Sequence, residues 1–99
     1  MNPFRLTAEA ATDLTEIFDY IAGDNVDAAQ RVANEIHHEL EKLARSPGIG
    51  HKREDLTAAR DVLFWRVYSY LIVYQPTSPL NVIAVLHSRR DVKTILAEH

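Results

Sequence analysis

Histidine and arginine side chains in the second half of the chain are the residue types that could act on a phosphodiester. His87 is followed by Arg89 and Arg90 directly after a short hydrophobic run, and His51 lies in a charged loop further back. An imidazole exchanges a proton near neutral pH, and a guanidinium holds a phosphate through two parallel hydrogen bonds. Metal-free RNA cleavage needs a base, an acid and such cations. Further cations in this half are Lys52, Arg60 and Arg66.

The same residues also have simpler interpretations, which the sequence leaves open. A strand that ends in a histidine and two arginines can be a solvated strand end without any chemistry. It can also be a basic rim that contacts an anionic surface, either a phosphate backbone or an acidic protein. The spacing alone does not bring His51 and His87 together, because that depends on whether the loop and the last strand end at the same rim.

Motifs that would indicate another chemistry are missing from the sequence. His37 and His38 are adjacent on a predicted helix, so they cannot share a face, and we expect both to be solvated. Ser88 lies between His87 and Asp91, but without the glycines of a nucleophile elbow. The sequence has no cysteine and no Walker, dinucleotide or calcium-loop motif. We therefore expect neither a metal site nor a cofactor.

The charge distribution divides the chain into an acidic first part and a basic second part. Residues 1–44 contain nine acidic and three basic residues, whereas residues 45–99 contain five acidic and eight basic residues. This asymmetry is typical of a protein with one face for an anionic partner, although acid-rich surface helices also produce it. With 99 residues, of which 46% are hydrophobic, we expect one domain over residues 1–99.

We expect this domain to lie in the cytoplasm and not to contact a membrane. No apolar run approaches the roughly 20 residues that a membrane span needs. The first residues are not followed by the apolar core of a signal peptide. The absence of cysteine fits a reducing compartment.

Two amphipathic helices are predicted in the first part of the chain. Phe4-Arg5-Leu6 forms a short opening strand, Thr7 can cap the helix that follows, and Asn25 can cap the next one. Apolar residues then recur at helical spacings of three and four. They are Ala10, Leu14, Ile17, Phe18 and Ile21 in the first helix, and Ala29, Val32, Ala33, Ile36, Leu40, Leu43 and Ala44 in the second. The link between the helices is short, which predicts an antiparallel hairpin.

Three β-patterned runs and a short helix are predicted in the second part. The runs cover residues 61–67, 70–75 and 81–87, and the helix lies within residues 91–98. The links between the runs suit hairpins, and the middle run is apolar almost throughout, as in a central strand. The sequence therefore predicts an α+β domain in which a two-helix hairpin packs on an antiparallel sheet of three or four strands. The last strand would deliver His87 to the rim of that sheet.

Motifs over nearly the whole chain resemble the ParE branch of the ParE/RelE toxin superfamily of bacterial toxin–antitoxin systems. Each motif is loose alone, but their order and spacing together are fairly specific. The matching pieces are Ala11-x-Asp13-Leu14-x-x-Ile17, Tyr20-Ile21-Ala22, Ala28-Ala29, Leu43-Ala44-x-x-Pro47-x-x-Gly50-His51-x-x-x-Asp55-Leu56, Tyr70-Leu71-Ile72-Val73-Tyr74 and Val85-Leu86-His87-x-x-Arg90-Asp91.

This resemblance implies a fold, a partner and two alternative targets. The fold would be RelE/ParE-like, a small ribonuclease-like α+β domain. Family toxins are cytoplasmic and form hetero-oligomers with a co-expressed antitoxin, here a ParD-like protein of the ribbon-helix-helix type. ParE-type members poison DNA gyrase, which is not an enzymatic activity, whereas RelE-type members are ribosome-dependent mRNA endonucleases.

The end of the chain favours the ParE branch. RelE-type nucleases usually carry an aromatic acid or base near the chain end, but here Ser88 follows His87 and no tyrosine occurs after Tyr74. We therefore expect gyrase inhibition, with target-binding residues His87, Arg89, Arg90, Arg60 and Arg66. The alternative, a metal-independent endoribonuclease, would use His51, Arg66, His87 and Arg89. A third hypothesis is a protein-binding module without toxicity.

Overall fold

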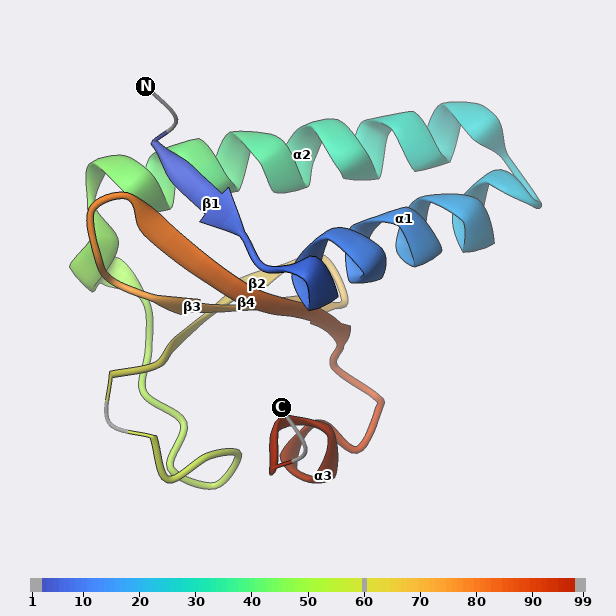
Figure 1. The fold of residues 1–99 in the computed structure, drawn as a ribbon. Coiled ribbons are helices and arrows are strands. Elements are labelled where there is room, and N and C mark those ends of the chain that lie inside the picture. Colours follow the sequence, from blue (N-terminus) through green and yellow to red (C-terminus); the bar gives the residue numbers. More distant parts are fainter. Residues whose placement is uncertain (1–2, 60, 98–99) are drawn as a thin grey trace.

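The chain forms a four-stranded sheet with a helical hairpin on one face and a short C-terminal helix on the other (Figure 1). The computed structural model describes residues 3–59 and 61–97. The elements are β1 (Phe4–Leu6), α1 (Ala8–Ala22), α2 (Val26–Arg45), the 3₁₀ turn η1 (Pro47–Ile49), β2 (Leu63–Val67), β3 (Tyr70–Gln75), β4 (Leu80–His87) and α3 (Val92–Ala97). This order confirms the predicted α+β class and the predicted sequence of elements.

The sheet is mixed rather than purely antiparallel, which corrects one detail of the prediction. Its strand order is β1-β4-β3-β2. The β2–β3 and β3–β4 pairs are antiparallel, whereas β1 runs parallel to β4, with Phe4 opposite Leu80. Hydrophobic patterns do not encode strand direction, so the sequence could not distinguish the two arrangements. The prediction of a central position for residues 70–75 is correct, because β3 lies between β4 and β2.

Short capping contacts set the beginnings of the two long helices, as the sequence predicted. The Thr7 side chain accepts a hydrogen bond from the Ala10 amide at 3.1 Å, and the Asn25 side chain accepts one from the Ala28 amide at 2.9 Å. Such contacts satisfy amides that have no partner inside the helix. The turn between β2 and β3 is also tight, and Tyr68 adopts a φ of 53° there, as the first residue of a two-residue hairpin often does.

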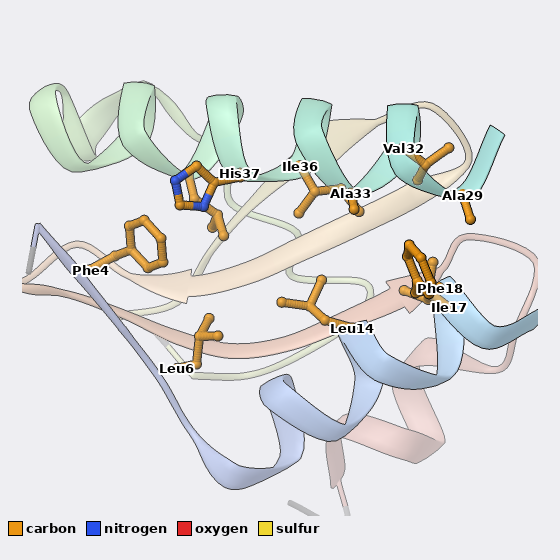
Figure 2. A pocket seen from close by; sticks show the side chains of 11 residues that line it. Phe4, Leu6, Leu14, Ile17, Phe18, Ala29, Val32, Ala33, Ile36 and His37 are labelled. Atoms are coloured by element: carbon orange, nitrogen blue, oxygen red, sulfur yellow. The ribbon is translucent and has the colours of Figure 1, made fainter. Parts of the chain in front are cut away.

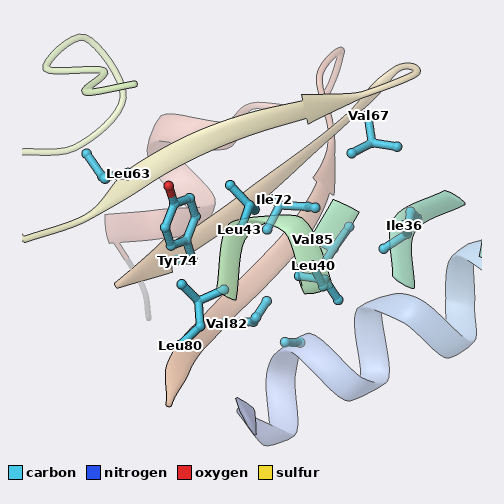
Figure 3. Packing of buried hydrophobic residues seen from close by; sticks show 11 residues of the cluster. Ile36, Leu40, Leu43, Leu63, Val67, Ile72, Tyr74, Leu80, Val82 and Val85 are labelled. Atoms are coloured by element: carbon cyan, nitrogen blue, oxygen red, sulfur yellow. The ribbon is translucent and has the colours of Figure 1, made fainter. Parts of the chain in front are cut away.

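The sheet buries apolar side chains on both faces. On the face below α1 and α2, side chains of the helices pack on alternating strand residues (Figure 3). The buried members of this cluster are Ala10, Ile36, Leu40, Leu43, Leu63, Val67, Ile72, Tyr74, Leu80, Val82 and Val85. The opposite face carries Val62, Phe64, Leu71, Val73, Ala84, Leu86 and Val92. Among the described residues, the loop before β2 and the six-residue α3 flank this second face, which is covered less than the face below the helical hairpin.

Candidate functional site

His87 is the last residue of β4, and its side chain lies on the helical face of the sheet. Its ring contacts the edge of the Tyr70 ring, with centroids 5.3 Å apart and planes at 83°. Its Nδ1 accepts a hydrogen bond from the Arg89 amide at 3.0 Å. The backbone then turns, because the Arg90 amide bonds to the carbonyl of His87 at 3.0 Å. Together these contacts fix the ring orientation and direct the two arginines away from the strand.

The surroundings of His87 are a shallow pocket at the end of α1. It has a volume of about 380 Å³ and is lined by Asp13, Glu16, Ile17, Tyr20, Tyr70, Val85, His87 and Arg90. Tyr20 is 85% exposed, which is unusual for a large aromatic side chain. Sequence reasoning did not select Tyr20, although an aromatic residue outside the apolar stripe of an acidic helix was a signal that could have found it.

His51 is held against the outer edge of β2 by two backbone hydrogen bonds. The His51 amide bonds to the Phe64 carbonyl and the Phe64 amide bonds to the His51 carbonyl, both at 2.8 Å. The His51 ring stacks on Trp65, with centroids 5.8 Å apart and an interplanar angle of 12°. The indole nitrogen of Trp65 in turn donates to Glu39 on α2 at 3.2 Å. The loop after η1 is therefore attached to the sheet at His51.

A groove on the sheet face opposite the helical hairpin brings several of the predicted residues together. It has a volume of about 460 Å³ and is lined by His51, Arg53, Leu56, Phe64, Arg66, Leu71, Ser88, Arg90 and Val92. We call it the cationic groove, because none of the described residues that line it is acidic. Arg66, on β2, points to this face because it alternates with the helix-facing Trp65 and Val67.

The structure does not bring the two candidate histidines into one site. His51 lines the cationic groove, whereas His87 lines the pocket on the helical face, and only Arg90 lines both. Arg89 is exposed and lines neither of the two. Arg60 falls outside the described residues, so its predicted role remains a prediction. The acid–base pair that the nuclease hypothesis needs is thus not assembled from these two imidazoles.

Internal contacts modify the charge of the cationic groove. Arg53 forms a bidentate ion pair with Asp55, with Nε–Oδ1 and Nη2–Oδ2 distances of 3.0 and 2.8 Å. This hydrogen bonding lowers the pKa of Asp55 and raises that of Arg53. Arg66 donates from Nε to the Tyr68 carbonyl at 2.9 Å. Sequence reasoning missed Arg53, although it follows His51 by only two residues.

A separate apolar pocket lies between β1 and the helical hairpin (Figure 2). Its volume is about 150 Å³, and its lining residues are Phe4, Leu6, Leu14, Ile17, Phe18, Ala29, Val32, Ala33, Ile36, His37 and Leu40. Figure 2 shows Phe4 and Leu6 of β1 facing side chains of α2 across this pocket. His37 packs edge-on against Phe4, with centroids 5.5 Å apart, yet its side chain is 64% exposed, and His38 is also exposed, as predicted.

Residues 3–59 and 61–97 contain neither a cluster of metal-ligand side chains nor a helix that could span a membrane. In this part of the chain, no three histidine, aspartate or glutamate side chains gather as metal ligands would. No helix within the same residues is long and apolar enough to span a membrane.

Comparison with known proteins places the chain in a family. The family model described as "ParE toxin of type II toxin-antitoxin system, parDE" matches residues 4–92. Toxin ParE1 of Caulobacter vibrioides is 29% identical over 99 residues, which cover 97% of this chain and 99% of that protein. A solved structure described as the chromosomal ParDE TA system from P. aeruginosa has a TM-score of 0.66 and 16% identity, over 83% of this chain and 90% of that chain. The structural similarity supports the fold alone, whereas the match to the family model shows the family. The chain therefore belongs to the ParE toxin family of type II toxin–antitoxin systems.

Proposed function

We propose that this ParE-family chain acts in the cytoplasm by inhibiting DNA gyrase and that a ParD-like antitoxin neutralises it. The observation that supports gyrase over messenger RNA is the separation of His51, at the outer edge of β2, from His87, at the end of β4, because strands β2 and β3 lie between them. A nuclease of the hypothesised type needs an acid and a base on the two sides of one phosphate. A protein that inhibits by binding needs only a complementary surface.

The surface that we propose for target binding is the end of β4 and its neighbourhood. It comprises His87, Arg89 and Arg90, with Arg66 on β2 as a further cation, and the predicted contribution of Arg60, which lies outside the described residues, stays a prediction. The exposed guanidinium groups of Arg89 and Arg90 suit an anionic target, and charge of this kind accelerates encounter with it. The exposed Tyr20 and the Tyr70–His87 ring contact add aromatic surface beside the arginines, a combination common in protein interfaces.

The partner that we propose is an antitoxin of the ribbon-helix-helix type, in a toxin–antitoxin hetero-oligomer. The apolar pocket between β1, α1 and α2 supports this proposal, because apolar side chains of an amphipathic segment fill such a pocket. Val32 and Ala33 on α2 are half-buried residues of this lining, so part of its apolar surface is accessible to such a segment.

Two assays on the wild-type chain test the proposed target. In the first, purified gyrase and supercoiled plasmid are incubated with the chain, and gyrase-linked cleaved DNA is measured. In the second, a translating extract is examined for cuts in messenger RNA. We expect cleaved DNA in the first assay and intact message in the second. Intact DNA in the first assay would contradict the proposal.

One observation favours a second candidate function. His51, Arg66, Ser88 and Arg90 share the cationic groove, so a ribosome-dependent endoribonuclease would have one imidazole and two cations in place. Translation-dependent cuts that disappear with His51→Ala and persist with His87→Ala would support that function. If neither assay shows activity, the chain is a binding module without toxicity.

Expression tests the proposed antitoxin separately. The lone chain should reduce host growth, and co-expression with the gene directly upstream in its genome should restore growth and yield a stable complex. Normal growth with the lone chain, together with no partner recovered from its own host, would contradict the proposal. An upstream gene without a ribbon-helix-helix pattern would also count against it.

A further inference from the structure

The cationic groove has properties that inhibition of a protein target does not require. Three of its lining residues are arginines, and Ser88 and His51 add a hydroxyl and an imidazole. The described residues that line the pocket around His87, by contrast, include two carboxylates, Asp13 and Glu16. The two concave surfaces at the end of the sheet therefore differ in charge, and the one on the open face suits a strongly anionic ligand.

The apolar residues of the groove belong to its wall and are already buried. Phe64, Leu71 and Val92 are 2%, 7% and 4% exposed, because they pack against one another beside α3, and Leu56 is half-buried against the same cluster. A peptide ligand would use an apolar anchor in an open pocket, and these side chains offer little free surface to such an anchor. The accessible part of the groove is its polar rim, which suits a ligand that presents repeated charges and no apolar side chains.

We propose that the cationic groove binds the phosphodiester backbone of a nucleic-acid strand, without cutting it. Arg66 and Arg90 hold phosphate oxygens through their guanidinium groups, and the Ser88 hydroxyl donates a further hydrogen bond. We expect the strand to remain intact, because His51 has no second imidazole beside it, among the described residues that line the groove, to complete an acid–base pair. Such contacts do not read base identity, so the binding is independent of sequence. The inference rests on the proposed function only in that Arg66 and Arg90 also belong to the proposed target-binding surface.

The ion pair of Arg53, which lines the groove, with Asp55, which does not, lowers the charge of the groove. Asp55 occupies the Nε–Nη2 edge of Arg53 at 3.0 and 2.8 Å, one of the two edges through which a guanidinium can hold a phosphate. In the wild type Asp55 balances the charge of Arg53, whereas Arg66 donates its Nε only to the neutral Tyr68 carbonyl. Loss of the Asp55 carboxylate should therefore add the charge of Arg53 to that of Arg66 and Arg90. This arrangement predicts one substitution that strengthens binding, beside those that weaken it.

The test measures binding of a short fluorescent single-stranded DNA to the full-length chain by anisotropy at several salt concentrations. Each phosphate contact contributes about −0.7 to the slope of log K against log salt for a single strand. We therefore expect Arg66→Gln and Arg90→Gln each to make the slope shallower by about 0.7 and Asp55→Ala to make it steeper by about 0.7.

Matched variants separate these effects from the net charge of the chain. Arg31→Gln removes one positive charge on the exposed surface of α2, on the other side of the sheet. Glu54→Gln removes one negative charge next to Asp55, and it releases no arginine from an ion pair. Both should leave the slope unchanged, and a thermal melt of each variant checks that it is folded. An oligoglutamate of equal charge should compete weakly.

Four results would overturn the inference. They are the absence of binding by the wild type at low salt, an equal effect of Arg31→Gln and Arg66→Gln, an unchanged slope in Asp55→Ala, and oligoglutamate that binds as tightly as DNA. The last result would assign the groove to an acidic protein instead. Gyrase inhibition without DNA binding would refute only this inference, whereas DNA binding without gyrase inhibition would refute only the proposed function.

Discussion

The carboxylate of Asp13 accepts a hydrogen bond from the backbone amide of Val85 at 3.0 Å, and this contact joins α1 to the edge of β4. The pairing of β1 with β4 ends at Leu6 and Val82. Beyond that point Thr7 bonds to β4, through its amide to the Val82 carbonyl at 3.0 Å and through its hydroxyl to the Ile83 carbonyl at 2.8 Å. Thr7, the N-cap of α1, and Asp13 within α1 therefore bond to backbone groups of β4 beyond the point where its pairing with β1 ends.

Replacing Asp13 by alanine should destabilise the fold by about 1–3 kcal/mol, because the Val85 amide would lose this partner in a half-buried position. Asp19→Ala removes the same group from an exposed position on the same helix and should change stability by less than about 0.5 kcal/mol. Urea denaturation of both variants measures the difference. Equal losses in the two variants would show that the contact with β4 contributes nothing.

Thr7→Ala should cost more than Asn25→Ala, although both residues are helix caps. Thr7 accepts from the Ala10 amide and also donates to Ile83, whereas Asn25 makes its capping contact at an exposed helix start. A cap alone contributes about 1 kcal/mol, and a hydrogen bond about 1 kcal/mol more. Chemical denaturation of the two variants gives the comparison, and a larger loss for Asn25→Ala would contradict it.

Gly50→Ala should destabilise the chain, whereas Gly48→Ala should be tolerated. A Cβ at position 50 would collide with the Tyr74 hydroxyl and approach two of its ring carbons to 2.9 Å, while a Cβ at position 48 meets nothing within 4 Å. The Tyr74 hydroxyl accepts from the Gly50 amide at 3.0 Å and donates to the Pro47 carbonyl at 2.7 Å, so it cannot move without losing both bonds. The expected cost is about 1–3 kcal/mol. Equal melting temperatures of the two variants would refute this explanation.

Stability should fall as the pH rises above about 10. Burial raises the pKa of Tyr74 above its ordinary value of 10.0, against an opposing effect of the Gly50 amide, and burial also raises the pKa of Tyr70. The folded chain then holds these protons more tightly than the unfolded chain, so the stabilisation is complete below pH 10 and is lost above it. Urea denaturation at increasing pH measures the slope. Tyr74→Phe should reduce it, and Tyr68→Phe, at a ring that is 59% exposed, is the control.

Replacing both Arg89 and Arg90 by alanine should abolish toxicity and leave the fold intact. Both side chains are exposed after the end of β4, so the stability change should stay within about 0.5 kcal/mol. Growth of cells that express the variant, together with its melting temperature, tests this expectation. Full toxicity of a folded double variant would show that Arg89 and Arg90 do not take part in target binding.

Local patterns determined the elements and their ends. A helix or a hairpin is stabilised largely by contacts close in sequence, so neighbouring residues predict it. This holds for the apolar stripes of α1 and α2, for the caps Thr7 and Asn25, and for the tight link at Tyr68-Ser69. The motifs that resemble ParE toxins were readable for the same reason, since they are fixed residues at fixed spacings. The family was thereby predicted correctly before any fold was available.

Only the tertiary structure decided which residues face one another. The parallel pairing of β1 with β4, the bond from Asp13 to Val85 and the contact of Gly50 with Tyr74 join positions far apart in the chain, and no local pattern encodes them. His51 and His87 looked equivalent in the sequence, but the attachment of the loop to the outer edge of β2 leaves strands β2 and β3 between His51 and His87. The order and register of the strands set this separation, and both are decided by long-range packing.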